Sequence, residues 1–231
     1  MAKIDTPMLG ERAQRALNMA FDVHRNQVRK SRGGQIPYFS HLSTVAGMVL
    51  ELNGTEDEFI AAILHDSVED QSANVVTWLS INAAQGHTVS LSPTAALEEI
   101  EKEFGTGVSD IIKQLTDPKL PKEFKSLPRD KRLPFIKEQR EKKFEKLRTA
   151  SDSVRKIKAC DALHNLRSLY QDYTETGPDV FKNFVADQEG TIWYYEKLAE
   201  IFNEYGPRRA GIEMEIMLSR LKAKIAAEKN L

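Results

Sequence analysis

The chain has 231 residues, of which 41% are hydrophobic, enough to bury a substantial core, and we interpret it as a single domain over residues 1–231. Its 33 basic residues nearly balance 34 acidic ones, and this formal charge of -1 argues against a dedicated nucleic-acid-binding or membrane-surface protein. The single cysteine, Cys160, excludes an internal disulfide, and the N-terminus lacks a secretory apolar segment, so we expect a soluble cytoplasmic protein without membrane spans.

Apolar residues recur at helical spacing along nearly the whole chain, whereas alternating strand-like segments are scarce. The sequence therefore predicts an all-α fold, a compact helical bundle. A first helix is expected over about residues 11–27 and a second over residues 42–52. Thr55 and Glu58 then form a capping box for a third helix, from residue 56 to about residue 68. The buried side of the first helix is expected to hold Ala16, Met19, Ala20 and Val23.

The second half of the chain continues the helical pattern after one interruption. Over residues 71–91 the pattern fades into a polar segment, which we interpret as an insertion. Ser92 and Pro93 then predict the N-cap and first residue of a helix that closes near residue 104. Further helices are expected over about residues 129–149, 153–170, 180–187, 192–205 and 207–229. The helix over 153–170 should bury Ile157, Cys160, Leu163 and Leu166.

The most unusual polar residues are the adjacent His65 and Asp66, which follow a long apolar run. Buried polar groups need partners, and imidazole with carboxylate suits a first-row divalent ion such as Mn²⁺, Fe²⁺ or Zn²⁺. If the helix continued, Glu69 and Asp70 would lie one turn further along the same surface. A locally hydrogen-bonded helix end is the alternative interpretation of this dipeptide by itself.

Five segments, spread over roughly residues 15–170, resemble one known family. They read HRNQVRKS at residues 24–31, PYFSH at 37–41, HDSVED at 65–70, FGTGVSDIIKQLTD at 104–117 and KACDALHNLRSL at 158–169. Their order resembles that of the HD-domain phosphohydrolase superfamily. Their residues resemble those of its alarmone (ppGpp) hydrolase branch, found in RelA/SpoT-type enzymes and small stand-alone relatives. Several such segments in order are more specific than any one alone.

The resemblance implies an activity and a role for each matching residue. The reaction would be hydrolysis of the 3′-pyrophosphate of ppGpp to GDP and pyrophosphate, with one divalent ion, Mn²⁺ being usual in the family. The implied metal ligands are His41, His65, Asp66 and Asp161; Glu69 and Asp70 would activate water; Arg29 and Lys30 would line the nucleotide pocket, and Asn165 would lie near the guanine. Residues 32–36 make the link after Lys30 longer than is usual in that family.

Other interpretations stay open at this point. A related phosphohydrolase could act on another nucleotide or phosphorylated metabolite, and a nucleotide-sensing module could keep the fold without turnover. Residues 119–148 hold twelve basic residues against five acidic ones, a pattern more typical of a solvated helix face than of an anion site. We expect His24 to buttress the site and Tyr38 to fill space beside it. The partner is expected to be a small nucleotide, with neither nucleic acid nor membrane, and the sequence does not decide whether a homo-oligomer forms.

Overall fold

The computed structural model describes residues 9–29, 35–82, 91–116, 124, 128–184 and 186–229. Within these ranges every regular element is a helix, apart from one isolated antiparallel bridge between Val28 and Pro37. The all-α prediction is therefore confirmed. In the same ranges no helix is both long and apolar enough to cross a membrane.

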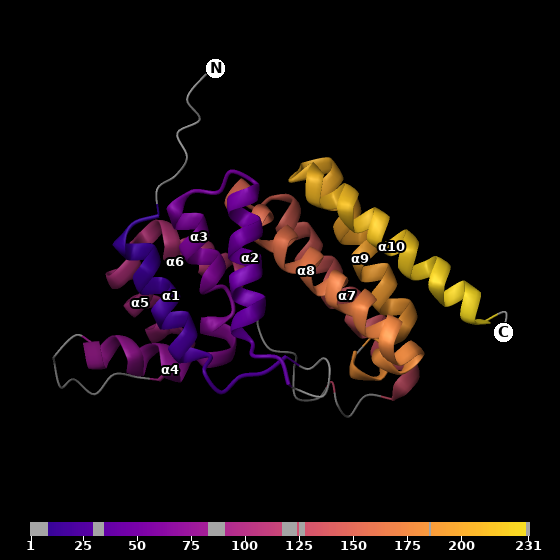
Figure 1. Ribbon diagram of the computed structural model, residues 1–231, viewed down its shortest axis with the longest axis horizontal. Helices are drawn as coiled ribbons and strands as arrows, with labels where there is room; N and C mark the ends of the chain where they lie inside the picture. Colours follow the sequence, from indigo (N-terminus) through magenta and orange to yellow (C-terminus); the bar gives the residue numbers. More distant parts are fainter. Residues whose placement is uncertain are drawn as a thin grey trace, which may run out of the picture. The chain divides into compact units, whose positions relative to one another are not determined.

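The helices fall into two compact units, the first holding α1 to α6 and the second α7 to α10 (Figure 1). The interpretation of residues 1–231 as one domain stays a prediction. The elements of the first unit are α1 (Glu11–Val23), α2 (Phe39–Glu51), α3 (Glu56–Ile63), α4 (Ser67–Asn82), α5 (Pro93–Phe104) and α6 (Thr106–Leu115).

Helix α3 is the core of the first unit. It packs against α1, α2 and α6, and every side chain from Phe59 to Leu64 is 6% exposed or less. A helix that is apolar on all sides is stable only when it is surrounded by other elements. The segment that leads into His65 is therefore held from every side.

Short-range signals predicted the helix starts well. Thr55 and Glu58 form the predicted capping box, with the Thr55 hydroxyl accepting from the Glu58 N–H and the Glu58 carboxylate accepting from the Thr55 N–H. The Ser92 hydroxyl accepts from the Ala95 N–H at 3.2 Å, so it is the N-cap of α5. All four residues expected on the buried side of α1 are buried, although α1 ends at Val23 rather than near residue 27.

One predicted helix boundary in the middle of the first unit is wrong. The third helix ends at Ile63, and residues 64–66 form a turn before α4 begins at Ser67. The interpretation of residues 71–91 as an insertion stays a prediction, but its first part is helical as far as Asn82, where Val75, Val76 and Leu79 are buried on one side of α4. Residues 83–90 lie outside the described ranges. A kink at Gln71 (φ -134°, ψ 27°) divides α4.

The second unit is built around α9. Its elements are α7 (Arg129–Arg148), α8 (Asp152–Thr176), the 3-10 helix η3 (Gly177–Asn183), α9 (Asp187–Tyr205) and α10 (Arg208–Lys229). Helix α9 packs against α7, α8, η3 and α10, and α10 also packs on α8 (Figure 1). The four residues predicted to be buried on α8 are buried. The helix expected over residues 180–187 is instead η3, which ends at Asn183.

Candidate active site

His65 lies in the turn that separates α3 from α4, and it is only 5% exposed. Its Nδ1 is 2.8 Å from the carbonyl oxygen of Ala62. Because a carbonyl oxygen only accepts, Nδ1 carries a proton, and in the neutral form of the ring Nε2 presents a lone pair. The backbone at the end of α3 thus selects the tautomer in which Nε2 is available as a ligand atom.

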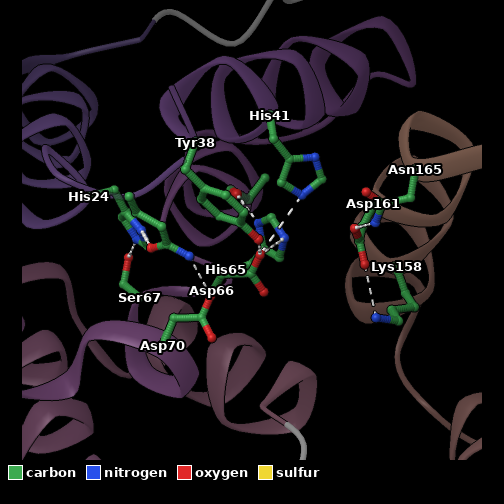
Figure 2. A network of polar contacts seen from close by, with 12 residues as sticks. His24, Tyr38, His41, His65, Asp66, Ser67, Asp70, Lys158, Asp161 and Asn165 are labelled. Carbon is green, nitrogen blue, oxygen red and sulfur yellow. Dashed lines mark hydrogen bonds and ion pairs between the residues drawn. The ribbon is translucent and has the colours of Figure 1, made fainter. Parts of the chain in front are cut away.

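The Asp66 carboxylate and two imidazole rings converge within the first unit (Figure 2). Oδ2 of Asp66 is 3.0 Å from Nε2 of His65 and 3.8 Å from Nε2 of His41, a 1% exposed residue near the start of α2. The two imidazole rings meet edge to face with centroids 5.2 Å apart. A nitrogen lone pair and a carboxylate oxygen at this distance repel each other unless a positive charge lies between them. The donor set therefore fits a divalent cation.

Tyr38 completes this side of the site in a way the sequence analysis missed. Its hydroxyl donates to Oδ2 of Asp66, the same oxygen that faces the two histidines. The Tyr38 ring stacks on His24 (centroids 5.5 Å apart, planes at 22°) and meets His41 edge to face at 5.4 Å. The expectation that Tyr38 only fills space is therefore incomplete, because the hydroxyl also orients Asp66.

The acidic pair lies in the first turn of α4. Glu69 is half-buried and Asp70 is exposed, and the Asp70 N–H donates to the carbonyl of Asp66 at 2.9 Å. The chain leaves α3 before the turn at residues 64–66, so one continuous helix does not form, but this bond keeps Asp66 and Asp70 one turn apart. Oδ2 of Asp70 accepts a hydrogen bond of 2.7 Å from Nε2 of Gln27, which lies just beyond α1.

Backbone pairing fixes the position of Arg29. Its N–H donates to the Ile36 carbonyl at 2.9 Å, and the Tyr38 N–H donates to the Gln27 carbonyl at 2.9 Å. The backbone at residues 27–29 therefore pairs with the backbone at residues 36–38. Arg29 lies opposite Ile36, two residues before Tyr38, although the segment that joins the two paired stretches is longer than is usual in the family. Arg29 is half-buried, and Lys30, the other predicted pocket residue, lies outside the described residues.

In the second unit, Asp161 on α8 is 8% exposed and both of its carboxylate oxygens accept hydrogen bonds (Figure 2). Oδ2 is 2.9 Å from Nζ of Lys158, one turn earlier, and Oδ1 is 2.6 Å from Nδ2 of Asn165, one turn later. These contacts hold the carboxylate in one orientation. The bond between Asn165 and Asp161 was not predicted from the sequence.

The basic helix α7 does not present all its charges to solvent. The Arg140 guanidinium lies 4.1 Å from the centroid of the Tyr194 ring and donates to the Gly190 carbonyl at 2.9 Å. Lys137 lies 5.3 Å from the ring centroid of Trp193. Burial lowers the pKa of Arg140, although Tyr194 partly offsets this. Part of the basic segment therefore packs on the aromatic residues of α9 as structural support.

Comparison with known proteins identifies a family and several similar proteins. A family model described as HD domain matches residues 16–192. A mouse protein named guanosine-3′,5′-bis(diphosphate) 3′-pyrophosphohydrolase MESH1 is 28% identical over 206 residues, which cover 83% of this chain and 93% of that protein. Its Xenopus tropicalis counterpart is 30% identical over 156 residues, 67% of each chain. A solved structure of a metazoan ortholog of SpoT, described as hydrolysing ppGpp, has a TM-score of 0.57 and 24% identity, covering 93% of this chain and 96% of that one.

Proposed function

This chain belongs to the HD domain family, and on that basis we propose that it is a metal-dependent phosphohydrolase that removes the 3′-pyrophosphate of ppGpp, giving GDP and pyrophosphate. The observation that carries this proposal is the likeness to guanosine-3′,5′-bis(diphosphate) 3′-pyrophosphohydrolases over most of the chain. The proposed site has the chemistry this reaction needs, since hydrolysis of a phosphate ester requires a nucleophilic water and neutralisation of phosphoryl charge.

Family membership implies a divalent metal, and we assign its ligands as His41, His65, Asp66 and Asp161, with Mn²⁺ as the ion. Two features support the assignment: the converging Nε2 and Oδ2 atoms of the first unit and the buried, doubly hydrogen-bonded carboxylate of the second. When bound, such an ion brings the pKa of a coordinated water close to neutrality and stabilises negative charge on phosphoryl oxygens.

The remaining residues of the proposed site bind the substrate and move the proton. Glu69 and Asp70, consecutive residues in the first turn of α4, are proposed to orient the attacking water and accept its proton. Arg29 and Lys30 are proposed to bind the phosphates by charge-assisted hydrogen bonds. The side-chain amide of Asn165 is proposed to lie near the guanine, and its bond to Asp161 would link base recognition to a ligand.

The decisive experiment measures the products that the purified protein forms from ppGpp with Mn²⁺. Anion-exchange chromatography should show GDP, and a pyrophosphate assay should account for the other product in equal amount. Release of orthophosphate from GTP, dNTPs or generic phosphomonoesters should be slower. Release from one of those compounds without GDP from ppGpp would refute the alarmone assignment and favour a related phosphohydrolase.

Two matched substitutions on α8 test the metal assignment. Asp161→Asn removes the carboxylate charge at the proposed ligand, and we expect it to lose both bound metal and hydrolysis. Asp152→Asn makes the same chemical change at a side chain that is 91% exposed in the first turn of that helix, and we expect it to keep both. Full metal occupancy in Asp161→Asn, measured by elemental analysis, would contradict the ligand assignment.

A further inference from the structure

His24 belongs to a buried polar network that has no role in the proposed reaction. It follows the last residue of α1 and is 2% exposed. Its Nδ1 lies 2.6 Å from Oε1 of Gln27, and its Nε2 lies 3.0 Å from the hydroxyl of Ser67, the first residue of α4 (Figure 2). Burial lowers the pKa of His24, which favours the neutral ring. One ring nitrogen therefore donates and the other accepts.

A chain of side-chain amides determines which nitrogen donates. The atom of Asn74 that lies 3.2 Å from the backbone carbonyl of Val23 must be its amino nitrogen, because a carbonyl oxygen only accepts. The same amino group donates to Oε1 of Gln71 at 2.7 Å, and Nε2 of Gln71 donates to Oε1 of Gln27 at 2.8 Å. The oxygen of Gln27 is thus an acceptor, and its amino group faces Asp70 at 2.7 Å.

The polarity of the whole chain follows from its two ends, a backbone carbonyl and a carboxylate, because neither can donate. Nδ1 of His24 must carry the proton, since it faces the accepting oxygen of Gln27. Nε2 then accepts from the Ser67 hydroxyl. A flipped Gln27 amide would place its oxygen against the Asp70 carboxylate and its amino group against two donors, so the network strongly disfavours the flip.

We propose that His24 and Gln27 are positioning residues that hold the carboxylate of Asp70 in its working orientation. The inference rests on the proposed function, in which Asp70 handles the attacking water. Asp70 is exposed, and an exposed carboxylate samples several rotamers unless a neighbour fixes it. Gln27 supplies a donor to one of its oxygens, and His24 prevents the Gln27 amide from turning over. Through Ser67, His24 also bonds the turn of α4 that carries Asp70.

Two substitutions of His24 separate positioning from simple packing. The amide nitrogen of His24→Asn can occupy the place of Nδ1 and still donate to Gln27. The longer side chain of His24→Gln places its amide near the former Nε2 and loses the Nδ1 donor. We expect His24→Asn to retain most of the wild-type kcat, and kcat of His24→Gln to fall about 10- to 100-fold, with KM and metal content unchanged in both. A purely structural role would not favour the shorter side chain.

Gln27→Glu gives an independent test, because it replaces the donor that faces Asp70 by a second carboxylate oxygen of the same shape. We expect kcat to fall by at least about tenfold, again without loss of metal. The matched control is Gln114→Glu, which changes an exposed amide of α6 that donates to the Asp110 carbonyl, and it should behave as wild type. Melting temperatures of all variants establish that each is folded.

The tautomer of His24 supplies a readout that does not depend on activity. ¹⁵N NMR of the imidazole should show a protonated Nδ1 and an unprotonated Nε2 in the wild type, the reverse of the form usual for exposed histidines. An Nε2-protonated ring would overturn the network. If wild-type protein makes GDP from ppGpp while His24→Gln and Gln27→Glu keep wild-type kcat, the positioning role is wrong and the proposed function stands. If the wild type acts only on another phosphate ester, the proposed function fails, and the same variants assayed on that ester decide the positioning role. No turnover of any substrate would refute both.

Discussion

Replacing Tyr38 by phenylalanine removes one hydroxyl and isolates its bond to Asp66. The ring should keep its stacking on His24 and its edge contact with His41. A hydrogen bond to a charged acceptor contributes about 1.5–3 kcal/mol, and removing a group that orients a metal ligand lowers metal affinity by about 10- to 100-fold. The two scales agree, since a factor of ten corresponds to about 1.4 kcal/mol. We therefore expect Mn²⁺ affinity of Tyr38→Phe to fall about 10- to 100-fold, with binding stoichiometry unchanged.

Isothermal titration calorimetry of wild type and variant with Mn²⁺, in one buffer and at one pH, measures this difference. The control is Tyr205→Phe, which removes another hydroxyl hydrogen-bonded to a carboxylate, that of Glu204, at a 39% exposed residue at the end of α9. Thermal unfolding without added metal separates loss of affinity from loss of stability. Equal Mn²⁺ affinity in wild type and Tyr38→Phe would refute the argument that the hydroxyl orients Asp66 for metal binding.

Three further predictions follow from the same contacts. If Asp161 is a ligand as proposed, the ammonium of Lys158 competes with the metal for its carboxylate, and a partly exposed ion pair contributes about 0.2–1 kcal/mol. Lys158→Met should therefore raise Mn²⁺ affinity by up to about fivefold, and weaker binding in calorimetry would show that the lysine assists instead. Glu69→Gln and Asp70→Asn should keep their metal and lose kcat, and wild-type rates in both single variants and the double variant would remove them from the reaction. Burial lowers the pKa of His24 in the folded protein. In the unfolded chain the same imidazole is protonated below about pH 6.5. Its contribution to stability is thus present above that pH and lost as pH falls through the folded pKa. The free energy of unfolding in urea should therefore fall less at acid pH in His24→Asn than in the wild type. The same pH dependence in both proteins would contradict this.

Most helices were predictable because their signals are local. The capping box of Thr55 and Glu58, and Ser92 before a proline, mark helix starts within four residues of sequence. The buried residues of α1 and α8 recur at the helical period, so their positions follow from counting alone. The 3-10 geometry of η3 and the helical course of α4 beyond Gln71 were not predictable in this way, because packing overrode a weak polar pattern.

The site was predictable only as a set of residue types. His41, His65 and Asp66 were identified from the sequence, and the structure brings these three together; their roles as ligands stay predictions. The turn at residues 64–66 has no glycine or proline to mark it. The bond from Gln27 to Asp70 joins positions 43 residues apart, and no periodic pattern reports a contact of that range.

The burial of α3 bears on what happens when metal leaves. In small zinc-binding domains the ion supplies the folding free energy, and the chain unfolds without it. Here the helix that leads into His65 is enclosed by its own unit, so its amide hydrogens should exchange with solvent only through global opening of that unit. Chelation should leave that protection almost unchanged. The imidazoles of His41 and His65 would then keep their positions without the ion. The protein could lose and rebind its metal without unfolding.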